Sequence, residues 1–166
     1  NFSYTEDEIL VKLSDKVYLQ GLIEKYWFLT DEILNDNLYY ALEGYLYPNT
    51  YRFKEDSTID EIVRKMLNET DKVLSEYKDV SDNKYSIHEL LAMASIVELE
   101  GSTGDDRAGV AGVFFNRLES GWSLGSDVTT YYAARVEMSE RDLWQHEIEN
   151  VNHYNTRPAA MAGKLP

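Results

Sequence analysis

The sequence predicts an α+β domain in which mixed helices and short strands surround a buried helix at about residues 87–100. Residues 87–100 are largely apolar at helical spacing, and Gly101 marks their end. Residues 57–77 carry a second, amphipathic helical pattern. Two segments rich in aromatic or β-branched residues, 39–51 and 122–132, predict strands next to turns. Together these patterns favour the α+β class.

The remaining elements follow from local start and stop signals. Thr5 and Glu8 form a capping-box pattern, and Thr30 opens a second start signal, so residues 1–38 predict short helices. Ser57 is the expected cap of the helix at 57–77, and Ser86 with Glu89 opens the helix at 87–100. Acidic caps at 105–106 then predict a helix that runs to residue 121, and residues 139–148 predict a short helix.

Composition excludes several classes of function. The 166 residues suffice for one compact domain, alone or with a small lobe. The net charge of −14 disfavours nucleic acid and anionic lipid surfaces as partners. The absence of cysteine excludes disulfides and thiolate sites, and the three histidines, at 88, 146 and 153, lack metal-ligand spacing. We therefore expect no metal site.

Two carboxylates at the end of the apolar helix are the first candidates for chemistry. On a helical wheel, Glu98 falls in the apolar sector of Leu90 and Leu91, whereas Glu100 lies on the side of Met93. Burial and the negative end of the helix dipole would both raise the pKa of such a carboxyl, as a general acid requires. The alternative is a solvated glutamate, or one paired with an arginine, at 107 or 117.

Other polar and aromatic clusters allow two interpretations. Ser126 and Asp127, followed by Thr129, form either a polar substrate loop or a turn before a strand. The tyrosines of residues 39–51 either stack on sugar rings or belong to the core. No phosphate-binding glycine motif and no nucleophile elbow is present in the sequence, so nucleotide and esterase chemistry lack support.

Five blocks in chain order resemble the MltG/YceG-like endolytic murein transglycosylases. They are LEGYLYPNTY (42–51), ASIVELE (94–100), GVFFNRL (112–118), LGSDVTTYY (124–132) and YNTR (154–157). The blocks depart from the family pattern at a few positions, including Gly125, where the family usually has Gln, and Leu99, where it has Lys. The resemblance covers about residues 39–166.

The resemblance implies cofactor-free cleavage of the β-1,4 bond between N-acetylmuramic acid and N-acetylglucosamine inside glycan strands, which leaves 1,6-anhydromuramoyl ends. By carry-over Glu100 is the catalytic acid, and Glu98 is a buried supporting residue. One carboxylate suffices for such a lyase, whereas a glycoside hydrolase needs two. The resemblance further implies that a glycan groove is lined or supported by Glu43, Tyr45, Ser126, Asp127, Thr129, Tyr154 and Asn155.

Family architecture also implies a location. Residues 1–38 are expected to be a membrane-proximal helical segment or a remnant of an N-terminal lobe, and residues 39–166 a catalytic domain that is incomplete at its C-terminus. A single-pass anchor would hold the full-length protein at the extracytoplasmic face of the cell membrane. The implied partners are peptidoglycan glycan strands and peptidoglycan synthases (penicillin-binding proteins).

Two other functions stay open from the sequence. A conventional muramidase would need a second carboxylate opposite Glu100, with Asp127 or Glu43 as candidates. A non-catalytic glycan-binding scaffold module would leave Glu100 exposed with no cleft beside it.

Overall fold

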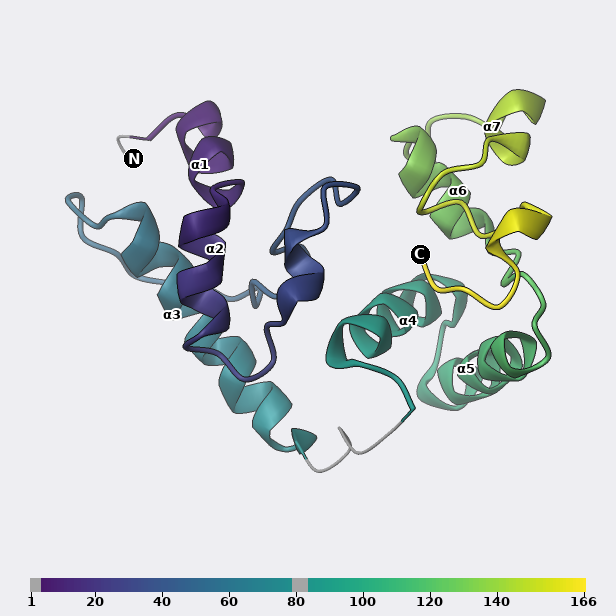
Figure 1. Cartoon of the computed structure of the whole chain (residues 1–166), viewed down its shortest axis with the longest axis horizontal. Coiled ribbons are helices and arrows are strands. Elements are labelled where there is room, and N and C mark those ends of the chain that lie inside the picture. Colours follow the sequence, from purple (N-terminus) through teal and green to yellow (C-terminus); the bar gives the residue numbers. More distant parts are fainter. Residues whose placement is uncertain (1–3, 79–83) are drawn as a thin grey trace. The chain divides into compact units, whose positions relative to one another are not determined.

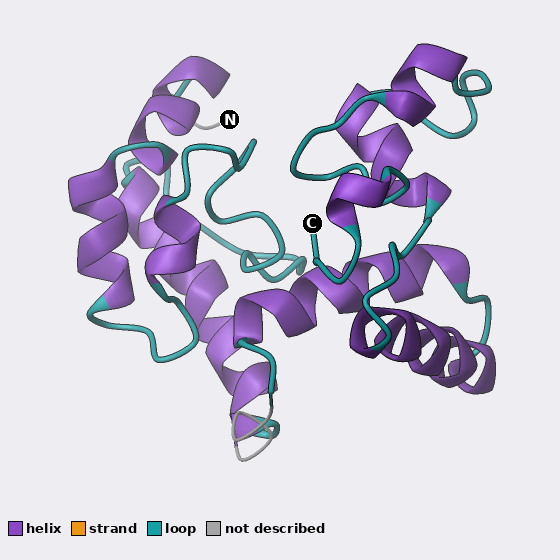
Figure 2. Cartoon of the chain, turned by 45° about the vertical axis from the view of Figure 1, so that its right-hand side comes forward, coloured by secondary structure: helices purple, strands orange, loops and turns teal. Residues whose placement is uncertain are grey.

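The computed structural model describes residues 4–78 and 84–166, and its regular elements there are all helical (Figure 1). They are α1 (Glu6–Leu13), α2 (Lys16–Ile23), η1 (Asp31–Leu34), α3 (Ile59–Ser75), α4 (Ile87–Glu100), α5 (Gly104–Glu119), α6 (Asp127–Ala134), α7 (Gln145–Glu149) and η3 (Ala159–Met161). No strand occurs in these described residues (Figure 2). The predicted α+β class is therefore wrong, and the described chain is all-helical.

The first predicted strand region, residues 39–51, forms turns and an extended loop. Backbone hydrogen bonds here join residues three positions apart. The N–H of Glu43 donates to the Tyr40 carbonyl, and the N–H of Tyr45 donates to the Leu42 carbonyl. Gly44 adopts a positive φ of 80°, a conformation that suits glycine. These groups bond locally and are therefore not offered to a neighbouring strand.

The second predicted strand region contains helix α6 instead. Ser126 is its N-cap residue, and the hydroxyls of Thr129 and Thr130 donate to the Ser126 carbonyl at 2.9 Å and 3.4 Å. Threonine in a helix can satisfy its hydroxyl through such a bond to the preceding turn. Tertiary context and this local bonding outweigh the β propensity of the segment.

Most predicted helices are confirmed, with shifted ends. Helix α4 has the predicted bounds, 87–100, and the Thr5–Glu8 capping box is present. Helix α3 begins after Thr58 rather than Ser57, and α5 after Thr103 rather than at the acidic pair 105–106. The helix predicted at 139–148 is the shorter α7.

The chain divides into two compact units, Asn1–His88 and Glu89–Pro166. In the first unit, the segment after α2 is tied to α3, because Tyr26 Oη donates to Asn68 Oδ1 at 2.9 Å and Trp27 Nε1 donates to Asp71 Oδ1 at 2.7 Å. The rings of Phe28 and Tyr45 stack in its core, 6.2 Å apart. The predicted division into a membrane-proximal segment, 1–38, and a catalytic domain, 39–166, is a division by function. It stays a prediction.

In the second unit, the C-terminal half of α4 packs on α5. The core consists of Met93, Ile96 and Val97 from α4, Phe114 from α5 and Leu124 from the loop before α6. This packing fixes the end of α4, where Glu100 lies.

A helix that crosses a membrane needs about 20 consecutive, mostly apolar residues. Among the described residues, none of the helices combines the length and the apolar character needed to cross a membrane.

Candidate active site

Glu100 is the last residue of α4 and lies on the same face of the helix as its buried residues. Met93, Ile96 and Val97 are buried at spacings that lead to position 100 one turn later. The side chains of Glu98 and Glu100 are both exposed, so their predicted burial is wrong. Helix α4 is apolar on most of its sides, and the sequence pattern alone does not select the face that packs on α5.

Gly101 permits a tight connection between α4 and α5. Its N–H donates to the Val97 carbonyl at 2.9 Å, which completes the helix. A Cβ at position 101 would lie 2.9 Å from Cα of Arg107, closer than side chains and backbone can approach. Arg107 Nε also donates to the Gly101 carbonyl at 3.1 Å. Glycine is therefore required directly after Glu100 if the start of α5 is to stay this close.

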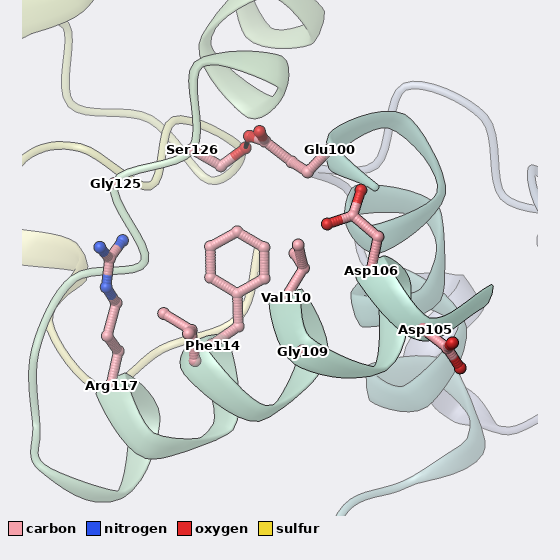
Figure 3. Close-up of a pocket in the computed structure, with 10 residues that line it drawn as sticks. Glu100, Asp105, Asp106, Gly109, Val110, Phe114, Arg117, Gly125 and Ser126 are labelled. Carbon is pink, nitrogen blue, oxygen red and sulfur yellow. Dashed lines mark hydrogen bonds between the residues drawn. The ribbon is translucent and has the colours of Figure 1, made fainter. Parts of the chain in front are cut away.

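A cavity of about 600 Å³ lies beside Glu100. Figure 3 shows Glu100 and Ser126 on one side of it, Arg117 on another, and the ring of Phe114 between them. The cavity is lined by Glu100, Asp105, Asp106, Gly109, Val110, Val113, Phe114, Arg117, Gly125 and Ser126. Its size falls within the usual range for small-molecule sites.

A short hydrogen bond joins two of the predicted site residues. Ser126 Oγ donates to Glu100 Oε1 at 2.6 Å (Figure 3). Ser126 is only 2% exposed, and although it is the N-cap residue of α6, its side chain makes no capping bond. In the described part of the chain, the other carboxylate oxygen of Glu100 accepts no hydrogen bond. One oxygen is thus held and the other is available.

The buried hydroxyls of Thr129 and Thr156 form a hydrogen-bonded cluster with the backbone of Ser126. The N–H of Ser126 donates to Thr156 Oγ1 at 3.1 Å, and the hydroxyls of Thr129 and Thr156 are 2.8 Å apart. The N–H of Gly125 donates to the Thr156 carbonyl at 3.0 Å. Thr129 is 6% exposed and Thr156 is fully buried. These bonds fix the backbone of Ser126 and hence the direction of its hydroxyl.

Asn155 ties this cluster to the neighbouring helix α7. Its Oδ1 accepts from Thr130 Oγ1 at 2.9 Å and from the N–H of Arg157 at 3.1 Å. Its Nδ2 donates to three carbonyls in and after α7, at distances of 2.7 to 3.2 Å, those of Glu147, Ile148 and Asn150. Asn155 is fully buried. The structure therefore places it as a support of α6 and not at the cavity surface.

Asp127 and Tyr154 lie at the edges of the same unit. Asp127 forms an ion pair with Arg157, and both side chains are partly exposed. Tyr154 packs edge to face against Tyr132, with ring centroids 4.9 Å apart. Neither residue is among those that line the Glu100 cavity. Their predicted roles in the glycan groove stay predictions.

Glu43 and Tyr45 belong to the other unit, Asn1–His88. Tyr45 is 1% exposed, and its hydroxyl is 2.8 Å from His88 Nδ1. Burial raises the pKa of the Tyr45 hydroxyl, and the charge of Glu32 adds to the effect. Glu43 is exposed. Tyr45 is thus a core residue of its unit, and a groove role for either residue stays a prediction.

Several residues at the site were not expected from the sequence. Asp106 lines the cavity, and its Oδ2 accepts from the N–H and the hydroxyl of Ser102 at 2.8 Å and 3.0 Å, bonds that lower the pKa of Asp106. In the described chain, Arg107 and Arg117 bond backbone carbonyls and pair with no acid, so the alternative ion pair to Glu100 is wrong. Thr156 belongs to the YNTR block, and membership of that family block is the sequence feature that could have marked it as a site residue.

A protein metal site needs several ligand side chains grouped around one point. The described ranges contain no group of three or more His, Asp or Glu side chains arranged to hold a metal ion.

The fold and cavity define a helical protein that holds a single glutamate at the edge of a cavity through a buried hydroxyl network. The sequence pattern of the family described as YceG-like matches residues 3–161. The chain therefore belongs to the YceG-like family. A solved YceG-like protein from Listeria monocytogenes superposes with a TM-score of 0.82 at 32% identity, covering 93% of this chain and 50% of that one.

Curated relatives carry a functional name. The endolytic murein transglycosylase of Bacillus subtilis is 35% identical over 156 residues, which are 92% of this chain and 43% of the relative. The protein of the same name from Streptococcus pneumoniae is 37% identical over 134 residues, or 79% of this chain and 24% of the relative. The chain thus spans less than half the length of these curated relatives.

Proposed function

We propose that this chain carries the catalytic part of an endolytic murein transglycosylase, with Glu100 as its single acid and base. The observation that carries the proposal is the 2.6 Å bond from the buried Ser126 hydroxyl to Glu100 at the edge of a cavity. The relatives named endolytic murein transglycosylase support the choice of substrate and reaction. Ser126, Thr129 and Asn155 then act as positioning residues.

In the proposed reaction, Glu100 begins protonated and gives its proton to the glycosidic oxygen. The bond between C1 of the muramoyl unit and that oxygen breaks, and the N-acetylglucosaminyl strand leaves with a free 4-hydroxyl. The Glu100 carboxylate then takes the proton of the muramoyl C6 hydroxyl, whose oxygen bonds to C1. The product is a 1,6-anhydromuramoyl end, no water is consumed, and Glu100 returns to its protonated form.

The hydrogen bond from Ser126 supports the proposal that one oxygen of Glu100 is held while the other transfers the proton. Ser126 holds Oε1 of Glu100, so the proton can reside on the oxygen that is not hydrogen-bonded. A carboxylate held through one oxygen keeps its direction while the other exchanges a proton with the substrate.

A conventional muramidase is the competing reaction, since Asp106 lines the same cavity. A hydrolase would need Asp106 to activate water or to attack C1. Both hydrogen bonds from Ser102 end on Oδ2 of Asp106, an arrangement that also serves to hold the start of α5. Asp127, the candidate from the sequence, is paired with Arg157. The non-catalytic scaffold is less supported, because Glu100 does line a cavity.

The proposed setting follows from the substrate. Murein lies outside the cytoplasmic membrane, so the catalytic part would act at the extracytoplasmic face. There, a membrane anchor elsewhere in the full-length protein and peptidoglycan synthases (penicillin-binding proteins) would be its neighbours. The names of the relatives support the glycan substrate, and the anchor and the synthases are inferred from the family resemblance alone.

Mass spectrometry of purified peptidoglycan digested by the chain tests the proposal. Wild type should give anhydromuramoyl ends, and Glu100→Gln should give none, while the exposed Glu137→Gln variant serves as the matched control. Glu98→Gln, in the same assay, tests the predicted supporting role. Reducing ends that require Asp106 would establish the hydrolase instead, and activity that survives in Glu100→Gln would refute the assignment of the acid.

A further inference from the structure

Arg117 is the only arginine or lysine among the residues that line the Glu100 cavity. It belongs to the GVFFNRL block, and it is not among the residues that the family resemblance places in the glycan groove. We propose that Arg117 binds a carboxylate on the arm at C3 of the muramoyl unit and so selects that sugar for cleavage. The inference rests on the proposed function and adds a specificity-determining residue to it.

The guanidinium of Arg117 is held in place but only partly used. It donates from Nη1 to the Leu124 carbonyl and lies 5.9 Å from the centre of the Phe114 ring. A guanidinium has five N–H donors. Within residues 4–78 and 84–166, Arg117 makes no ion pair and no other hydrogen bond. A half-buried, oriented cation therefore keeps most of its donors for a ligand.

The acids around the cavity do not neutralise Arg117. Glu100 is bonded to Ser126 and Asp106 to Ser102. Figure 3 shows Asp105 directed away from the labelled cavity residues. In this chain of net charge −14, Arg117 is the cation that lines the cavity, and within the described residues it has no acidic partner. An anion on the substrate would complete its coordination.

Access to Arg117 is open on the side of Gly125. This residue has a positive φ of 67°, and a Cβ there would lie 3.6 Å from Nη1 of Arg117. The family that the chain resembles usually has Gln at this position. With Gly125 in its place, no side chain from position 125 covers the guanidinium of Arg117. The planar fork of arginine fits a carboxylate through two parallel bonds.

The chemistry of the substrate supplies such a group. Muramic acid differs from glucosamine by a lactyl ether on C3, and this ether ends in a carboxyl. In peptide-free strands this carboxylate is free, and in peptide-bearing strands it is an amide, so that the nearest carboxylates belong to the stem peptide. If Arg117 binds the carboxylate on this arm, the muramoyl C1, and not the N-acetylglucosaminyl C1, lies beside Glu100.

Binding measurements in the Glu100→Gln background separate recognition from turnover. The probes are peptide-free glycan strands with free lactyl carboxylates, the same strands converted to methylamides, and strands with intact stem peptides. Arg117 should make the free acid bind about tenfold tighter than the methylamide at low salt, and the ratio should shrink as salt rises. Arg117→Gln should bring the ratio to about one, whereas Arg117→Lys should keep part of it.

Arg135→Gln is the matched control, because it removes one exposed charge from the same unit outside the cavity and should keep the ratio. Dependence on Arg117 that appears only with peptide-bearing strands would support the proposal with the stem peptide as the source of the carboxylate. Equal binding of acid and methylamide by the Glu100→Gln protein, together with binding of peptide-bearing strands that does not depend on Arg117, would overturn it, and so would no binding of any strand. So would an equal loss for both probes in Arg117→Gln and Arg117→Lys, which would mark a structural role.

The product assay keeps the two proposals distinguishable. Anhydromuramoyl products from wild type without any carboxylate preference would overturn the role of Arg117 alone. A carboxylate preference that depends on Arg117, without products from wild type, would overturn the proposed reaction and leave the recognition of an acidic glycan supported.

Discussion

Asn155→Ala should destabilise the second unit around α6, because one buried amide makes five hydrogen bonds. The substitution leaves the fully buried Thr130 hydroxyl with only its longer bond of 3.4 Å to the Ser126 carbonyl. It also leaves the Arg157 N–H and three carbonyls without the amide. Since two N–H groups serve those three carbonyls, about four full bonds are lost, each with a net contribution of about 0.5–1.5 kcal/mol. Water can replace some of them, so we expect a loss of about 3 kcal/mol.

Hydrogen exchange of the backbone amides of α6 measures this loss inside the unit, without assuming that both units unfold together. A decrease of about 3 kcal/mol corresponds to exchange that is about 100-fold faster. Asn116→Ala, at an exposed position on α5, is the matched control and should change stability by less than about 0.5 kcal/mol. Acceleration below about tenfold in Asn155→Ala would refute the idea that Asn155 holds α6 to α7.

Two further predictions concern the site and acid stability. Ser126→Ala should lower the rate of product formation at least about tenfold, because its hydroxyl bonds Glu100. It should cost less than about 1.5 kcal/mol of stability, because that hydroxyl does not cap α6. An unchanged rate would contradict the positioning role of Ser126. Hydrogen bonds from Arg141 and from the Trp144 N–H lower the pKa of Glu147 from 4.5 to about 2, so its stabilising contribution is present above about pH 4.5 and lost as the pH falls to about 2. In urea unfolding across that range, Glu147→Gln should flatten the acid slope, and an unaltered slope would refute the assignment.

The helices were predictable where local signals define them. Residues 87–100 start and stop at the expected positions, and the glycine that marks the end, Gly101, allows a close approach of Arg107 that a side chain would block. The segment 124–132 was not predictable from β propensity, because Ser126 begins a helix whose threonines bond back to it. Residues rich in tyrosine, such as 39–51, can fill a core from turns as readily as from strands.

The site was only partly readable from the sequence. The family blocks marked Glu100 and Ser126, which the structure joins across 26 positions of sequence. The helical wheel placed Glu98 in the core because it was aligned on Leu90 and Leu91, whereas packing on α5 buries Met93 and Ile96. Long-range packing also decides that Arg117 lines the cavity, and no spacing within one helix encodes that contact.

Ser126 begins α6 without a capping bond and bonds Glu100 instead. A serine at an N-cap ordinarily accepts a hydrogen bond from the first turn of its helix, and such a bond contributes about 0.5–2 kcal/mol. Ser126 makes no such bond and directs its hydroxyl to Glu100 instead. Thr129 and Thr156 hold the backbone of Ser126 in this position through buried bonds. A capping role alone would need none of that network, whereas the proposed function needs the carboxylate of Glu100 to be oriented, so the network is what that proposal predicts.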